Sequence, residues 1–301
     1  MTPRTVRWVA AGAVAGLLAL AGGVAFSRVP ASPQPAPAPA YKPPVPAGPA
    51  DFTVSGEATQ GGWLRGTVPG GTVRLTLDGV AVPVAPDGSF FVAFDRDAGG
   101  SAVLAAALRG GRRVERQLTV SPRAWRIERI NAARTPGGPT EAFMKIREPE
   151  LARINAARAV NADSDGWRQR FIWPAKGRIS GLFGSQRIYR GEPGAYHSGL
   201  DIATGTSGTP FVAPADGVVV LAAQAPFSLE GNLLMIDHGN GLNSAFLHCS
   251  AILVKEGERV KQGQVIGRIG ATGRATGPHL HWSMKWREAR LDPLLFTGPM
   301  Q

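Results

Sequence analysis

The stretch His197-Ser-Gly-Leu-Asp201, followed further along the chain by His248 and by His279-Leu-His281, decides the architecture of the C-terminal half. The 301-residue chain has five histidines, and four of them lie at these positions. Residues two or four apart in an extended segment point to the same face, so each short motif can converge on one point from neighbouring strands. Histidine and aspartate are zinc ligands, and a catalytic zinc takes three protein ligands and one water. The sequence therefore predicts a zinc site on a β-sheet.

The chain contains no H-E-x-x-H sequence, which excludes a glutamate base carried on a zinc-binding helix. If two histidines and Asp201 bind the metal, His248 and one member of the His279/His281 pair remain to transfer protons. The base at this site is therefore expected to be a histidine.

The residues around these positions carry a specific resemblance. The motifs are His-Ser-Gly-Leu-Asp-Ile-Ala (197–203), Pro-Ala-Asp-Gly-Val-Val (214–219), Asp-His-Gly-Asn-Gly (237–241) and Gly-Ala-Thr-Gly-Arg-Ala-Thr-Gly-Pro-His-Leu-His-Trp (270–282). With these motifs the chain, over residues 171–296, resembles the lysostaphin/LytM-type zinc endopeptidases, which cut peptide cross-links in bacterial cell walls.

The resemblance assigns a role to each position. It implies that His197, Asp201 and His281 bind one Zn²⁺, and that His248 and His279 form a catalytic pair that does not bind it. One of the pair would act as general base and the other would donate a hydrogen bond to the oxyanion. The sequence does not distinguish the two.

Several neighbouring residues depart from the family pattern or have a second reading. Phe246 stands where the family often has tyrosine, and Cys249 where leucine is common; a single cysteine is expected to be a small buried hydrophobe. Arg187 follows a phenylalanine-glycine pair that resembles the family's entry motif, so it is a candidate to bind a substrate carboxylate, with a surface salt bridge as the alternative. His238 precedes Gly239-Asn240-Gly241 and is expected to be a structural turn residue.

Three functions are compatible with this pattern. The resemblance implies an active endopeptidase that acts on the peptide stems of peptidoglycan. The alternatives are a non-catalytic cell-wall-binding or amidase-activating relative, and a zinc hydrolase for a non-peptide bond. Relatives of the second kind are recognised by lost zinc ligands, and all five site positions are filled here.

The N-terminal part of the sequence predicts that the chain is exported from the cytoplasm. Residues 1–28 hold a charge-free run, Trp8–Ser27, behind Arg4 and Arg7, which is typical of a signal peptide or an N-terminal membrane anchor. Residues 29–50 form a Pro/Ala-rich linker that favours an extended conformation. We therefore expect a cell-envelope protein that is periplasmic, anchored in the inner membrane or secreted, with the inner membrane as a partner if the segment is retained.

The fold class is expected to be mainly β. Residues 51–121 show alternating runs separated by turn signals, which predicts a small immunoglobulin-like β-sandwich. Residues 122–170 predict a short helical connector, because a pattern at 129–134 is repeated at 153–158, with Pro149 placed to open the second helix. Residues 171–301 predict an antiparallel β-sheet metallopeptidase domain. Residues 253–269 are expected to extend its sheet, and a groove over the sheet would hold an extended peptide.

The net positive charge of the chain bears on which anionic partners it could bind. The formal net charge is +11 and the pI is about 10.7, yet the sequence has no helix-turn-helix, zinc-finger or aromatic-basic stripe that would indicate nucleic acid. Attraction to anionic cell wall and lipid accounts for the excess of positive charge. The single cysteine excludes an internal disulfide.

Overall fold

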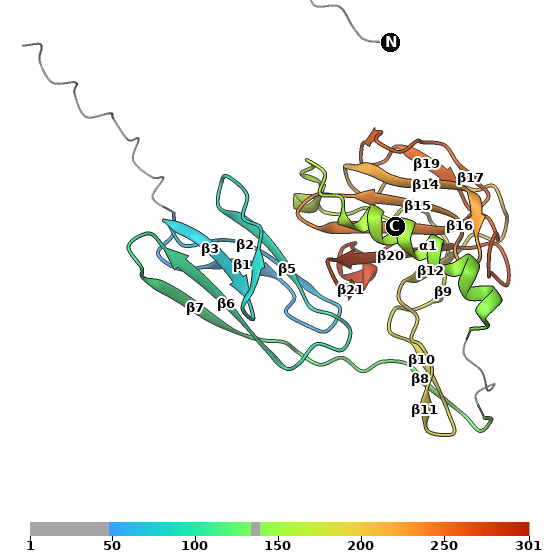
Figure 1. Ribbon diagram of the computed structural model, residues 1–301, viewed down its shortest axis with the longest axis horizontal. Helices are drawn as coiled ribbons and strands as arrows, with labels where there is room; N and C mark the ends of the chain where they lie inside the picture. Colours follow the sequence, from blue (N-terminus) through green and yellow to red (C-terminus); the bar gives the residue numbers. More distant parts are fainter. Residues whose placement is uncertain (1–47, 134–138, 301) are drawn as a thin grey trace, which may run out of the picture. The chain divides into compact units, whose positions relative to one another are not determined.

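A computed structural model describes residues 48–133 and 139–300 of the chain (Figure 1). The expected leader, residues 1–28, and nearly all of the expected linker lie outside these ranges. Among the described residues, no helix is both long enough and apolar enough to cross a membrane. The described chain is mainly β, with one α-helix, which confirms the predicted fold class.

The N-terminal strands form two antiparallel sheets, ordered β1-β2-β5 and β4-β3-β6-β7. This pairing is the two-sheet arrangement expected of an immunoglobulin-like sandwich. Asp78 and Gly79, both with positive φ, make the tight turn between β3 and β4 that the sequence indicated. The strands are β1 (Thr53–Gly56), β2 (Trp63–Thr67), β3 (Thr72–Leu77), β4 (Val80–Val82), β5 (Ser89–Ala93), β6 (Ser101–Leu108) and β7 (Arg113–Thr119).

The segment after the sandwich is only partly helical, so the connector prediction was wrong in its first half. There, β8 (Ile127–Ile130) pairs in parallel with β10 (Gln186–Tyr189), which also pairs with β11 (Glu192–Pro193). Backbone pairing with an available strand edge outweighs the weak helical preference of this short segment.

The helix in the second half of the connector, α1 (Glu141–Ala159), begins eight residues before Pro149, not at it. Thr140 accepts a hydrogen bond from the Phe143 amide and so caps the helix, which explains the earlier start. A 3₁₀ turn, η1 (Gly166–Arg168), follows the helix.

The C-terminal strands build one eight-stranded sheet with the order β18-β14-β15-β16-β20-β12-β9, and β21 pairs with β20. Its neighbouring strands are antiparallel, as predicted. The strands are β9 (Arg178–Gly181), β12 (Leu200–Ala203), β14 (Gly217–Phe227), β15 (Gly231–Asp237), β16 (Leu242–Cys249), β18 (Arg259–Val260), β20 (Leu280–Trp286) and β21 (Ala289–Leu291), and a 3₁₀ turn, η2 (Pro293–Leu295), follows β21.

Residues 253–269 do not simply extend this sheet, contrary to expectation. Only the two-residue strand β18 joins it, at the edge beside β14. The strand β19 (Val265–Arg268) lies instead at the centre of a separate three-stranded sheet, between β13 (Pro210–Val212) and β17 (Ala251–Ile252). The two-residue strands are too short for their side-chain pattern to select a sheet.

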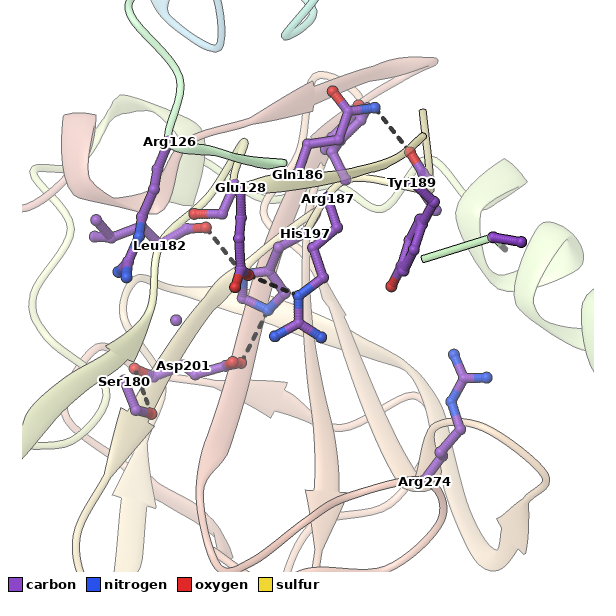
Figure 2. A pocket seen from close by; sticks show the side chains of 16 residues that line it. Arg126, Glu128, Ser180, Leu182, Gln186, Arg187, Tyr189, His197, Asp201 and Arg274 are labelled. Carbon is purple, nitrogen blue, oxygen red and sulfur yellow. Dashed lines mark hydrogen bonds and ion pairs between the residues drawn. The ribbon is translucent and has the colours of Figure 1, made fainter. Parts of the chain in front are cut away.

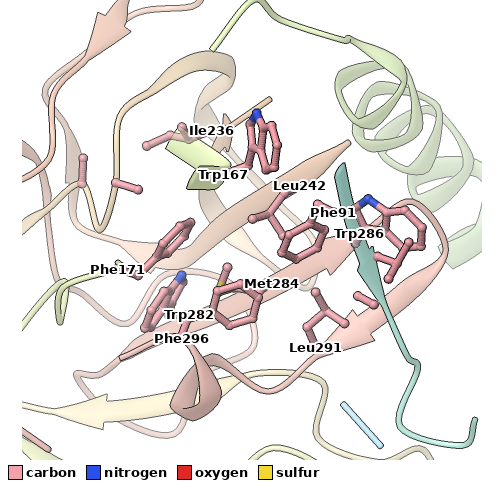
Figure 3. Close-up of a cluster of buried hydrophobic side chains, with 14 of the residues drawn as sticks. Phe91, Trp167, Phe171, Ile236, Leu242, Trp282, Met284, Trp286, Leu291 and Phe296 are labelled. Carbon is pink, nitrogen blue, oxygen red and sulfur yellow. The ribbon is translucent and has the colours of Figure 1, made fainter. Parts of the chain in front are cut away.

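Both faces of the eight-stranded sheet are covered by apolar side chains. Along β15, Leu234 and Ile236 belong to the main core, while Leu233 and Met235 belong to a second cluster that includes Ile154 of α1. Figure 3 shows part of the main core, in which the sandwich residue Phe91 lies beside Trp286. Because side chains alternate along a strand, α1 and the main core occupy opposite faces.

Candidate metal centre

Two of the predicted metal ligands face each other across a pair of neighbouring strands. Asp201 of β12 is paired with His281 of β20 in the antiparallel register. The His281 Nδ1 atom lies 2.9 Å from the Asp201 Oδ1 atom. Directly opposed residues share a face of the sheet, so the ladder brings together two groups that are 80 residues apart in sequence.

The third predicted ligand, His197, lies in the loop just before β12. The expectation that it would lie within a strand was therefore wrong. Its Nε2 atom is 3.1 Å from both Asp201 Oδ1 and His281 Nδ1. Its Nδ1 atom lies 3.1 Å from the carbonyl oxygen of Leu182. A bond from Nδ1–H to that carbonyl would fix the ring and leave Nε2 free to bind a metal.

The geometry of the three donor atoms fits a single cation. The donor atoms of His197, Asp201 and His281 all lie within 4.8 Å of one another. Tetrahedral zinc with bonds of 2.0–2.1 Å places its ligands about 3.3 Å apart, close to the separations of 2.9 and 3.1 Å found here. Two imidazoles and one carboxylate are also a known catalytic zinc set, with the fourth position left open.

Two glycines make room for this cluster. A Cβ atom at Gly199 would lie 2.5 Å from His281 Nε2, and a Cβ atom at Gly181 would overlap the carboxylate of Asp201. The sequence motif included Gly199 without a reason for it, and Gly181 was missed. No spacing rule pointed to Gly181, because it lies on β9 and approaches the site only through its pairing with β12.

The ionisation of the cluster favours an anionic aspartate. Burial disfavours the Asp201 carboxylate, but hydrogen bonds and attraction from His197 and His281 outweigh burial and lower its pKa. Burial lowers the pKa of His281, against the opposing effect of Asp201. For His197, burial acts in the same direction, but the bond to Asp201 prevails and its pKa is raised.

A β-bulge brings His248 to the site. Leu234 pairs with Phe246 and Asn232 with Cys249, so two residues of β16, Leu247 and His248, stand opposite the single residue between Asn232 and Leu234. His248 has a φ of 64°, which is uncommon for a residue other than glycine. In an unbroken strand His248 would point to the same face as Phe246, into the core. The bulge turns it toward His279 and His281, whose ring centroids lie 4.9 and 6.2 Å away.

The rings of His248 and His279 are held in the same way. The Nδ1 atom of His248 lies 2.8 Å from the carbonyl oxygen of Thr272, and that of His279 lies 2.8 Å from the carbonyl oxygen of Gly277. A carbonyl only accepts, so Nδ1 carries the proton and Nε2 of a neutral ring has a free lone pair. Burial, together with the neighbouring histidines, lowers the pKa of His248.

A cavity of about 920 Å³ opens beside the metal centre, and Asp201 and His197 line it (Figure 2). Arg187 also lines this cavity, but its guanidinium Nε donates to Glu128 of β8 at 2.8 Å. This ion pair raises the pKa of Arg187. The surface salt bridge expected as the alternative for Arg187 is therefore present. The binding of a substrate carboxylate by Arg187 stays a prediction. The strand β8, which sequence reasoning missed, supplies part of the cavity wall.

The remaining candidates are structural. His238 is fully buried, with its Nδ1 atom 2.8 Å from the carbonyl oxygen of Asp216 and its Nε2 atom 2.7 Å from Ser244 Oγ. Cys249 is buried, and burial raises the pKa of its thiol to about 12. Phe246 is buried against Phe211, with ring centroids 5.2 Å apart, so it cannot contact a substrate in the cavity.

Fold and site together define a class of protein: an antiparallel sheet that carries two histidines and an aspartate around one point, beside two further histidines, is typical of a metallohydrolase. Residues 195–293 match the family described as Peptidase family M23. This match confirms the expected resemblance: the C-terminal part of the chain is similar to the peptidases of that family.

Named relatives are similar over the same part of the chain. The peptidoglycan DD-endopeptidase ShyA of Vibrio cholerae is 41% identical over 133 residues, which are 44% of this chain and 30% of ShyA. The DD-carboxypeptidase/endopeptidase Mpg of Neisseria meningitidis is 40% identical over 126 residues, 40% of this chain and 27% of Mpg. The matched part thus spans less than a third of the length of these relatives.

The similarity to a solved structure covers most of the chain. The crystal structure of a candidate peptidase M23 from Pseudomonas aeruginosa is 29% identical, with a TM-score of 0.61, and the alignment covers 81% of this chain and 96% of that one. The similarity therefore extends beyond the C-terminal domain into the preceding strands.

Proposed function

We propose that this chain is a zinc-dependent endopeptidase that hydrolyses peptide cross-links of bacterial peptidoglycan. The observation that carries the proposal is the convergence of one atom each from His197, Asp201 and His281, with the rings of His248 and His279 beside them. The relatives named as peptidoglycan endopeptidases support the choice of substrate.

His197, Asp201 and His281 would hold the zinc through Nε2, a carboxylate oxygen and Nδ1. When bound, zinc acts as a Lewis acid and lowers the pKa of a coordinated water to about 7. Asp201 contributes the negative charge that favours a divalent cation, and the Leu182 carbonyl orients His197.

His248 and His279 would perform the proton transfers. Each keeps Nδ1 on a backbone carbonyl and has Nε2 available to the site. The lowered pKa of His248 keeps that ring neutral near pH 7, as a general base requires. The partner ring would donate a hydrogen bond to the oxyanion that forms on the scissile carbonyl.

The envelope location is part of the proposal. The substrate lies outside the cytoplasm, and the charge-free N-terminal run would direct the chain there, either as a cleaved signal or as an anchor in the inner membrane. The net charge of +11 would favour association with anionic wall polymer.

The test uses the full-length chain incubated with cross-linked murein, with release of free amines and bound zinc as readouts. His281→Ala should lose both metal and cleavage, because a ligand is removed. His248→Ala should keep the metal and lose cleavage. The exposed Lys255→Ala is the control and should retain both.

Retained turnover in His248→Ala would remove His248 from the mechanism. Wild-type chain that binds zinc but leaves murein intact would favour a non-catalytic wall-binding protein.

A further inference from the structure

An ion pair joins helix α1 to the turn between β14 and β15. Arg147 donates from Nη1 to Glu230 Oε2 and from Nη2 to Glu230 Oε1, both at 2.6 Å. The side chains are only 10% and 15% exposed. A two-pronged, nearly buried pair of this kind fixes both the distance and the angle between its partners.

A second carboxylate completes the contact. Glu150 accepts hydrogen bonds from the amide and the hydroxyl of Ser228, both at 2.6 Å, and from Arg147 Nη1 at 3.0 Å. One arginine thus holds two carboxylates that would otherwise repel each other in a poorly solvated place. The hairpin tip, which we define as residues 228–231, is therefore held by α1 through Ser228 and Glu230.

The other side of the hairpin tip holds a residue of the active site. The carbonyl oxygen of Glu230 accepts the backbone N–H of His248 at 2.8 Å. His248 sits at the bulge with φ of 64°, a conformation that costs about 1–2 kcal/mol in an L-residue and persists only when its surroundings impose it. The Glu230 carbonyl is one of the two backbone oxygens that fix His248, the other being that of Thr272 on its ring.

Helix α1 also lies on the face of the sheet that carries the metal centre. Leu247 is paired with His281, so their side chains share a face, and Leu247 packs against the apolar cluster of Ile154 and Ala157. The helix therefore borders the site, although the catalytic motifs lie entirely outside it.

We propose that Arg147 of α1 is a positioning residue for His248, acting through Glu230. The inference rests on the proposed function, because it assigns His248 a role in proton transfer. The guanidinium holds the Glu230 side chain and thereby fixes the position of the Glu230 backbone. The carbonyl oxygen of Glu230 then holds the backbone of His248 in the bulged conformation. Removal of the guanidinium would leave Glu150 and Glu230 facing each other, so that the hairpin tip moves away and His248 relaxes.

The experiment compares full-length variants. Arg147→Met removes the pair, and Arg147→Lys keeps the charge but not the two-pronged geometry. Arg153→Met is the matched control, because Arg153 lies on the same helix with its guanidinium 5.0 Å from the Phe227 ring centroid and has no ion pair among the described residues. The readouts are bound zinc, kcat and KM on a cross-linked murein peptide, thermal unfolding, and amide hydrogen exchange of His248 by NMR.

Arg147→Met should keep its zinc and its KM, and lose between about tenfold and a hundredfold in kcat, as a small displacement of a catalytic group does. Exchange of the His248 amide should accelerate by about tenfold or more, because its acceptor is no longer held. Arg147→Lys should lie between this variant and wild type, and Arg153→Met should match wild type in kcat, KM and exchange.

Two results would overturn the proposal: unchanged kcat and unchanged His248 exchange in folded Arg147→Met, or an equal loss in Arg153→Met. If Arg147→Met does not fold, the exchanged pair Arg147→Glu with Glu230→Arg tests the same contact, and it should recover exchange and kcat relative to Glu230→Arg alone. A wild-type chain that fails to cleave murein would refute the proposed function, whereas the exchange rate of His248 would still decide the positioning role.

Discussion

At the scale of single residues, Gly199 is as necessary to the metal centre as the ligands beside it. A Cβ atom there would lie 2.5 Å from His281 Nε2 and 2.8 Å from the Trp282 carbonyl oxygen, so His281 would have to turn away. We expect Gly199→Ala to weaken zinc binding by about tenfold to a hundredfold, as changes behind a ligand do. Titration with a competing chelator measures this.

The control for that variant is Gly99→Ala, because a Cβ atom at Gly99 meets no atom within 4 Å. It should bind zinc as the wild type does. Equal affinities for the Gly199→Ala variant and the wild type would mean that His281 has room to move.

His238 makes stability depend on pH. Burial lowers its pKa to about 4, so the folded chain keeps the ring neutral while the unfolded chain protonates it below about pH 6.5. The unfolded state then binds more protons, and stability falls as pH drops from 6.5 toward 4. Between pH 6.5 and 5 we expect the stability advantage of wild type over His238→Asn to shrink by about 2 kcal/mol. Urea unfolding at both pH values measures the difference, and a constant difference would contradict the expectation.

The sequence was sufficient to nominate the five candidate residues that the structure brings together, because few other side chains bind zinc or transfer protons near pH 7. It could not reveal how they converge. His248 and Phe246 are two apart, so alternation alone places them on one face, yet one ring is in the site and the other in the core.

At the scale of secondary structure, the bulge in β16 is what directs the rings of His248 and Phe246 to different places. A bulge inserts one unpaired residue and leaves no mark on composition or periodicity that a single sequence can show.

The connector is a second case in which the sequence pattern alone does not determine the element. The sequences at 129–134 and 153–158 are identical, yet Ile130 ends a strand and Ile154 lies in a helix. Pairing with the edge of β10 makes the first segment part of a strand, and the cap at Thr140 favours a helix in the second.

The short helix η2 is tied to the segment that leads into β8. Asp292 caps η2 through the Leu294 amide and accepts from Arg123 Nη2 at 2.8 Å. Burial raises the pKa of Asp292, and Arg123 opposes this effect. Arg123→Met leaves a buried carboxylate unpaired, so we expect a loss of about 3 kcal/mol in unfolding free energy.

Chemical denaturation measures that loss, and adding Asp292→Asn to the Arg123→Met variant should recover part of it, since the charge is then gone. A double variant as unstable as the sum of the two single variants would argue against a direct interaction.

At the scale of the whole described chain, β5 joins the sandwich to the C-terminal domain. Its residues Phe90 and Phe91 are both fully buried. Phe90 packs against Phe52 within the sandwich, and Phe91 against Trp286 and Phe296 of the C-terminal part. The alternating pattern expected of residues 51–121 implies one covered side for each strand, and it did not indicate that the C-terminal part would cover the second side of β5.

We expect Phe91→Ala to destabilise the C-terminal domain by about 3–5 kcal/mol, because a large buried ring is removed from between the two parts. Loss of murein cleavage with increasing urea reports on this domain. Val73→Ala, at a side chain that is 62% exposed, is the control and should leave the curve unchanged. An unchanged curve for Phe91→Ala as well would show that the two parts unfold independently.

The register between β12 and β20 has a consequence for fragments of the chain. Asp201 meets His281 only when strands 80 residues apart in sequence have joined, so the centre is among the last features that chain growth can complete. Any piece that stops short of residue 281, whether from interrupted synthesis or from proteolysis, lacks one of the three ligands. A wall-cutting activity that depends on these ligands would therefore be confined to molecules that have been made through to β20.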